Sequence, residues 1–274
     1  MKNKILFLFV SIICFGCASK TTVAQSTQEQ KPVLVEFSSS EGMKRLRESE
    51  YSADFFLLAN FFESQDNGIV CGPTTAAIVL NALNSRSLRE KTYTVSRDTS
   101  SINQAERKFI PSDFDPFLNS YTQNNVFDAS YVSKDANKAI KSRSHVYGKS
   151  SDNKPDFGFQ IRQFDALLKA HGLKSQLRVV TDDIDEENVR NEIINNLATT
   201  GDVVVVNYKR SVMGQAGGGH ISPLGAYHKA SDSVLILDVN PAKADWVWVK
   251  VSDLVAAMRT KDTVENRGYL LVSK

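Results

Sequence analysis

The chain has 274 residues, of which 42% are hydrophobic, and its 33 basic and 31 acidic side chains give a formal net charge of +2. This length and composition allow a sizeable core in one domain or in two tightly joined lobes. Without a basic stripe the chain lacks the electrostatic footprint that phosphate backbones require, so nucleic acid is not the expected partner.

The N-terminus predicts export. Residues 1–4 are basic and residues 5–13 form an apolar run that is too short to span a membrane, so residues 1–16 are expected to be a signal peptide. Loss of this segment would remove two lysines and leave a formal net charge of zero.

The segment after the signal predicts an anchor. Cys14-Phe-Gly-Cys17 resembles a bacterial lipobox, which implies lipidation of Cys17 and an exported, periplasmic protein held at the membrane. Simple secretion is the alternative. Residues 17–32, rich in Ser, Thr and Gln, are expected to be a flexible tether, and residues 33–274 the catalytic domain.

Cys71 is expected at the N-terminus of a mostly apolar helix that continues through residues 75–83. The helix dipole and unpaired N–H groups there would lower the pKa of the thiol. If Cys17 is lipidated, Cys71 is the free thiol of the mature protein and a candidate nucleophile. The amide of Gln65, six residues earlier, could form an oxyanion hole with the Cys71 N–H. The alternative is a buried structural cysteine.

The rest of the chain predicts helices followed by strands. Residues 84–113 read as irregular and residues 123–155 as a polar insertion near the cleft. Helices are expected at 161–170, ended by Gly172, at 185–197 and at 252–258; strands are expected at 177–180, 203–208, 220–227, 233–239, 246–249 and 269–272. This order predicts an α+β fold in which a helical lobe packs on an antiparallel sheet.

His220 is the candidate base for the thiol. It follows three glycines, Gly217 to Gly219, and opens a predicted strand that would hold the imidazole rigidly, although a satisfied core histidine has the same pattern. Of the other histidines, His171 is expected to cap a helix, and His145 and His228 are expected at the solvated surface.

Asp238, eighteen residues after His220, is the candidate orienting carboxylate because a charge at the end of an apolar strand needs a partner. A turn contact at Asn240 explains it about as well. A metal site built from Asp238, His220 and His228 fits no standard zinc spacing, so no metal site is predicted.

These residues resemble the phytochelatin synthase family, in particular its bacterial short form. The resemblance runs from residue 55 to residue 274 and is strongest over residues 65–84 and 201–272. It implies a papain-like cysteine protease fold. The residues it assigns are a catalytic Cys71, His220 and Asp238, an oxyanion donor Gln65, and substrate-binding Arg210, Gly219 and Arg267.

The resemblance also implies an activity. Cys71 would cleave the Cys–Gly amide of glutathione through a γ-glutamylcysteinyl thioester, which passes either to a second glutathione, giving phytochelatin, or to water. Plant members continue into a cysteine-rich domain beyond the point where this chain stops, and forms without it imply that hydrolysis dominates.

No cofactor is expected to be required; a heavy-metal ion such as cadmium could act as activator or as a thiolate complex of the substrate. The oligomeric state stays open, with a homodimer as one option. The alternative from another class is an exported thiol protein that binds heavy metal without turnover.

Overall fold

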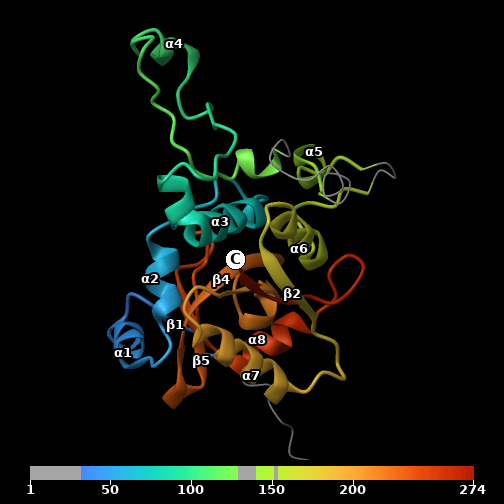
Figure 1. Cartoon of the computed structure of the whole chain (residues 1–274). Coiled ribbons are helices and arrows are strands. Elements are labelled where there is room, and N and C mark those ends of the chain that lie inside the picture. The colour runs from blue at the N-terminus through green and yellow to red at the C-terminus, as the bar shows by residue number, and fades with distance from the viewer. Residues whose placement is uncertain (1–31, 129–139, 151–153) are drawn as a thin grey trace, which may run out of the picture. The chain divides into compact units, whose positions relative to one another are not determined.

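A computed structural model describes residues 32–128, 140–150 and 154–274 (Figure 1). The predicted signal peptide, Cys17 and all but the last residue of the predicted tether lie outside the described residues. Residues 31–274 group into one compact unit. In the described ranges, none of the helices combines the length and apolarity needed to cross a membrane.

The centre of this unit is an antiparallel sheet in the order β1-β6-β5-β4-β3-β7-β2. Its strands are β1 (Val35–Glu36), β2 (Lys174–Val179), β3 (Val203–Lys209), β4 (Gly219–His228), β5 (Ser233–Ile236), β6 (Val247–Lys250) and β7 (Gly268–Ser273). The register between β3 and β4 sets Tyr208 opposite His220, which places two polar rings at one end of the sheet.

Helices cover both faces of the sheet. The helices of the described residues are α1 (Ser40–Glu48), α2 (Ala53–Ala59), α3 (Cys71–Arg89), α4 (Gln104–Arg107), α5 (Arg143–Val146), α6 (Ile161–Ala170), α7 (Glu186–Leu197) and α8 (Val251–Met258), of which α4 and α5 lie away from the sheet. The long α3 and α6 pack on one face, and α7 and α8 pack on the other (Figure 1).

The β3 sequence shows why both faces are covered. Val203 and Val205 point to the core under α3 and α6, whereas Val204, Val206 and Tyr208 point to the core under α7 and α8. Successive strand residues face opposite sides, so a strand buried on both faces needs an uninterrupted apolar run.

The α+β class is confirmed, and each helix and strand named from residue 161 onward is found. The helices, however, sandwich the sheet instead of forming a lobe on one side of it. The strand predicted over 233–239 ends at Ile236. Asp238 lies beyond that end because its carboxylate accepts the backbone N–H of Asn240 at 2.8 Å and turns the chain. The helices α1 and α2 were not predicted.

Candidate active site

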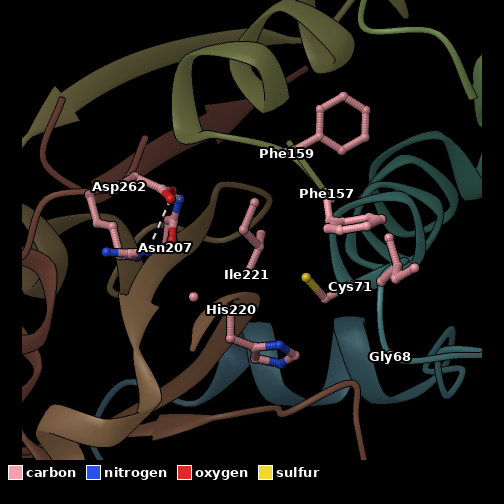
Figure 2. Close-up of a pocket in the computed structure, with 12 residues that line it drawn as sticks. Gly68, Cys71, Phe157, Phe159, Asn207, His220, Ile221 and Asp262 are labelled. Atoms are coloured by element: carbon pink, nitrogen blue, oxygen red, sulfur yellow. Dashed lines mark hydrogen bonds and ion pairs between the residues drawn. The ribbon is translucent and has the colours of Figure 1, made fainter. Parts of the chain in front are cut away.

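Cys71 is the first residue of α3, as predicted. Val70 provides no side-chain cap, so the first N–H groups of the helix have no intrahelical partner and can donate elsewhere. One turn along, the Thr75 hydroxyl donates to the carbonyl of Ile221 at 3.0 Å. This bond ties the start of α3 to β4 and brings Cys71 beside His220, whose ring lies next to the sulfur in Figure 2.

His220 lies between the thiol and Asp238. It is buried, it hydrogen-bonds the Cys71 thiol, and its Nε2 lies 3.0 Å from Oδ1 of Asp238. The separation is that of an ion pair, although the Nε2 proton is not well aligned with a carboxylate oxygen. Because Nε2 faces Asp238, Nδ1 is left to face the sulfur, so the three side chains line up as nucleophile, base and orienting carboxylate.

The electrostatics of the pair favour separated charges. Burial alone would raise the pKa of Cys71, but the hydrogen bond and charge of His220, with backbone N–H groups at Ile221 and Gly72, lower it overall. Burial likewise would lower the pKa of His220, and Asp238 and Cys71 raise it. The site therefore favours a thiolate beside an imidazolium.

Asp238 is fully buried and held by three donors besides His220. Arg210 donates through Nη2 at 2.7 Å, the Tyr208 hydroxyl at 3.1 Å and the Asn240 N–H at 2.8 Å. Burial would raise the pKa of Asp238, but His220 and Arg210 lower it, so the carboxylate stays charged.

Arg210 packs against Asp238. Its guanidinium is 3% exposed, bonds Asp238 and Gln215, and is absent from the residues that line the cavity beside Cys71. Gly217, with φ +121°, lets the chain pass Arg210, since a Cβ there would come within 3.1 Å of its Cδ. Arg210 therefore supports the Asp238 carboxylate, and a direct contact with the substrate stays a prediction.

Gln65 lies on the loop that leads to Cys71. Its backbone N–H donates to the carbonyl of Val239 at 2.8 Å, which ties this loop to the residue after Asp238. Its side-chain Nε2 donates to the carbonyl of Asn67, and among the described residues its Oε1 has no hydrogen-bond partner. One N–H of the amide is therefore engaged within the loop, and an amide nitrogen carries a second.

A cavity of about 240 Å³ opens at Cys71 (Figure 2). Phe157 and Phe159 line it, and Gly72 allows this packing because a Cβ there would lie 2.6 Å from the Phe159 ring. Across the cavity from Cys71 in Figure 2 lie Asn207 and Asp262. The cavity thus has a nucleophile on one side, polar groups on the other and aromatic rings along its wall.

Arg267 and Gly219 also line this cavity, and their role as substrate contacts stays a prediction. Arg267 donates to Asp262 at 3.0 Å, while Asp262 also accepts from Asn207 at 3.1 Å. Burial lowers the pKa of Arg267, and its Nε lacks a hydrogen-bond partner within the described part of the chain. A Cβ on Gly219 would meet Arg267 Nη2 at 2.8 Å, so this position admits only glycine without a shift.

The remaining histidines take no part in this cavity. His171 is buried, with Nε2 2.7 Å from the Val126 carbonyl, and His145 bonds Ser142 at the surface. The prediction that His228 is solvated is wrong: it ends β4, is buried and packs edge-on against Trp248. Across residues 32–128, 140–150 and 154–274, no group of three or more His, Cys, Asp or Glu side chains could hold a metal ion.

Sequence reasoning missed several residues that line the cavity, among them two polar and two aromatic side chains. Asn207 gave a signal, since it is the one polar residue within the apolar β3 run. Asp262, Phe157 and Phe159 gave none, because they lie outside the strands and helices that were predicted and reach the cavity only through tertiary folding.

The thiolate–imidazolium pair predicts an alkylation profile. Iodoacetamide is expected to react rapidly with Cys71 at pH 6, because the pKa of the thiol is lowered by His220. In His220→Ala the pKa should rise toward or above the ordinary value, and the rate at pH 6 should fall at least about tenfold. Stopped-time mass spectrometry measures both rates, with His145→Ala as the control that keeps the wild-type profile. Equal profiles for wild type and His220→Ala would contradict the pairing.

The chain is similar to a known protein family and to several of its members. A family model described as phytochelatin synthase matches residues 26–105 and 113–269. Glutathione gamma-glutamylcysteinyltransferase 3 of Lotus japonicus is 28% identical over 249 residues, which are 89% of this chain and 43% of that protein. The protein of the same name numbered 1 from Arabidopsis thaliana is 26% identical over 250 residues, 89% of this chain and 42% of its own.

A shorter match supports the same assignment. Glutathione gamma-glutamylcysteinyltransferase of Schizosaccharomyces pombe (strain 972 / ATCC 24843) is 29% identical over 117 residues, 42% of this chain and 28% of that protein. In each of these three matches, this chain spans less than half the length of the relative. Since the family model covers most of the sequence, the chain belongs to the phytochelatin synthase family.

Proposed function

We propose that this protein is a cysteine-dependent enzyme that cleaves the Cys–Gly amide of glutathione. The observation that carries the proposal is the cavity in which Cys71, paired with His220 and Asp238, lies across from the ion pair of Asp262 and Arg267. The names of its relatives, glutathione gamma-glutamylcysteinyltransferases, agree with a glutathione-derived substrate.

The polar side of the cavity suits the γ-glutamyl end of glutathione. That end is a free amino acid with one α-carboxylate and one α-ammonium, and Arg267 and Asp262 offer one charge of each sign beside the Asn207 amide. Burial lowers the pKa of Arg267, and a substrate carboxylate would offset that penalty. With this head fixed, the chain of the substrate points toward Cys71, where the amide to be cleaved would lie.

The chemistry then follows from the charges at Cys71. The thiolate adds to the Cys–Gly carbonyl, and the Cys71 N–H with the second N–H of the Gln65 amide would hold the oxyanion. The His220 imidazolium gives its proton to the departing glycine nitrogen, the C–N bond breaks and a thioester remains. Asp238, kept ionised by Arg210, holds the imidazole orientation through both steps.

We further propose that the fold is papain-like. The assignment is supported by a thiol at the N-terminus of the central helix, a histidine at the start of a facing strand and a carboxylate just beyond the end of the next strand. None of the steps above needs a resident metal; a heavy-metal ion would enter as a thiolate complex of the substrate.

Water is the proposed acceptor for most of the thioester. A cavity of about 240 Å³ lies below the roughly 300–1,000 Å³ of typical ligand pockets, so the γ-glutamylcysteinyl group would occupy it and leave little room for a second glutathione. Gln123 and Tyr147, from the polar stretch over 123–155, also bond the loop that leads to Cys71 and help to fix its position. Transfer would need a positioned acceptor, because positioning can be worth effective molarities of roughly 10⁵ M.

Products from glutathione test this proposal. Mass spectrometry is expected to show mainly γ-glutamylcysteine and glycine, with the shortest phytochelatin as a minor product that rises with glutathione concentration. A control with γ-glutamylcysteine as substrate should show no glycine release. If oligomeric phytochelatins were the main products at low millimolar glutathione, the assignment as a hydrolase would be wrong. The nucleophilic role of Cys71 would be unaffected.

A further inference from the structure

The loop that carries Gln65 is held in place by one buried side chain, Gln123. Gln123 lies two residues before the short 3₁₀ helix Asn125–Phe127, far from Gln65 in sequence, and is only 7% exposed. Its backbone N–H donates to the half-buried carboxyl of Glu63. Its side-chain amide bonds the same loop next to Gln65. The backbone and the side chain of Gln123 therefore both contact the segment around Gln65.

Each contact of the Gln123 amide joins a different group. Its Oε1 accepts from the Asp66 N–H at 2.9 Å and from the Thr74 hydroxyl at 3.0 Å, and its Nε2 donates to the Ser64 carbonyl at 3.2 Å. Ser64 and Asp66 are the two neighbours of Gln65. A single amide therefore clamps the backbone on both sides of Gln65, and Oε1 has both lone pairs in use.

The same amide connects this loop to the nucleophile. Thr74 stands in the first turn of α3, and its single hydroxyl proton is shared between Gln123 Oε1 at 3.0 Å and the Val70 carbonyl at 2.9 Å. The loop is thus held at two places. Gln123 connects it to α3, and the bond between the Gln65 N–H and the Val239 carbonyl connects it to the residue after Asp238. Gln123 sets the distance between the two oxyanion donors, because one donor is on α3 and the other is on the loop.

We propose that Gln123 is a positioning residue that holds the Gln65 amide where the oxyanion forms. The inference rests on the proposed function, in which Gln65 donates to that oxyanion. Donors on a loop stabilise a transition state only when neighbouring contacts hold them beforehand, and displacement by about 1 Å can lower the rate about 100-fold. Gln123 is not among the residues that line the cavity, so it would act through its contacts with the Gln65 loop and with Thr74.

Gln123→Ala is expected to lower kcat for glutathione cleavage roughly 10- to 100-fold. KM should stay within about twofold, because Asn207, Asp262 and Arg267 keep their contacts. The iodoacetamide rate of Cys71 at pH 6 should be unchanged, since His220 sets the pKa of the thiol. If Gln123→Ala does not fold, Gln123→Glu keeps the two acceptor contacts, loses the donor to Ser64 and should give an intermediate kcat.

Asn125→Ala is the matched control. Asn125 is 8% exposed and also makes three hydrogen bonds, to the backbone of Thr122, Ser96 and Ser120, but none to the Gln65 loop. It should lower the thermal midpoint about as much as Gln123→Ala does and leave kcat within about twofold of wild type. A merely structural Gln123 would behave like Asn125.

A double-mutant cycle decides the proposal. If Gln123 acts through Gln65, the variant Gln65→Ala/Gln123→Ala should be no slower than Gln65→Ala alone. Additive losses in kcat, normal turnover in Gln65→Ala, or a changed alkylation rate in Gln123→Ala would each overturn the assignment of Gln123 in an otherwise active enzyme. Absence of glutathione cleavage by wild type would instead overturn the proposed function and the inference that rests on it.

Discussion

Replacement of Cys71 by Ser is expected to abolish glutathione cleavage while the fold stays intact. The hydroxyl is close in size to the thiol, so the packing at the start of α3 survives, but the pKa of serine is far too high for His220 to hold an alkoxide. His220→Ala should be as severe, because the thiol then loses the partner that lowers its pKa. We expect losses in kcat of roughly 10⁴-fold or more for each.

Turnover assays on purified variants measure this, with thermal unfolding to verify the fold. His145→Ala removes an exposed histidine that bonds only Ser142 among the described residues, and it should retain full activity. The double variant Cys71→Ser/His220→Ala should be no worse than either single one, since the two residues act as a unit. Near-normal cleavage by folded Cys71→Ser would falsify the cysteine mechanism, whereas absence of cleavage by the wild type would favour the thiol protein that binds metal without turnover.

The core of the site could be predicted from sequence because each member sits at a local structural boundary. Cys71 begins an apolar helix and His220 follows a glycine run into a strand, and both patterns are visible within about ten residues. Asp238 stood out as a charge in an apolar run, although the strand ends before it. What joins the three, the bond from Thr75 to Ile221, is a tertiary contact that no local pattern shows.

The positions of the residues around this core could not be predicted, because they too depend on tertiary contacts. Arg210 and Arg267 both follow or precede strands in a similar way, yet one is buried under Asp238 and the other lines the cavity. Gln123 contacts Asp66 across 57 positions of sequence. His228, beside Lys229 at the end of β4, is buried because Trp248 of β6 packs on its ring. Contacts between residues far apart in sequence determine where each of these side chains lies. A short stretch of sequence does not show such contacts.

Replacement of Arg210 is expected to lower the stability of the protein strongly. Its guanidinium and the Asp238 carboxylate form a buried ion pair at 2.7 Å, 3% and 0% exposed. Arg210→Met keeps the unbranched aliphatic part of the side chain but leaves the carboxylate without its guanidinium donor, and breaking such a pair typically destabilises a protein by about 3–5 kcal/mol. Urea unfolding at pH 7 measures the loss. Arg178→Met, which breaks a half-exposed pair with Glu192, should lose at most about 1 kcal/mol.

The pH dependence separates this role from substrate binding. In the wild type the pKa of Asp238 is depressed in the folded state, so its contribution to stability is present above the unfolded pKa and is lost as pH falls through the folded one. Without Arg210, burial is opposed only by His220 and the neutral donors, and the pKa of Asp238 should rise. The stability gap between wild type and Arg210→Met should therefore be widest near pH 7 and narrow as Asp238 becomes protonated in acid.

The kinetics of Arg210→Met give a second test. Because Arg210 does not line the cavity, kcat of this variant should fall while its KM for glutathione stays within about twofold of wild type. Unchanged stability together with a large rise in KM would show instead that Arg210 binds the substrate, as the family resemblance first implied.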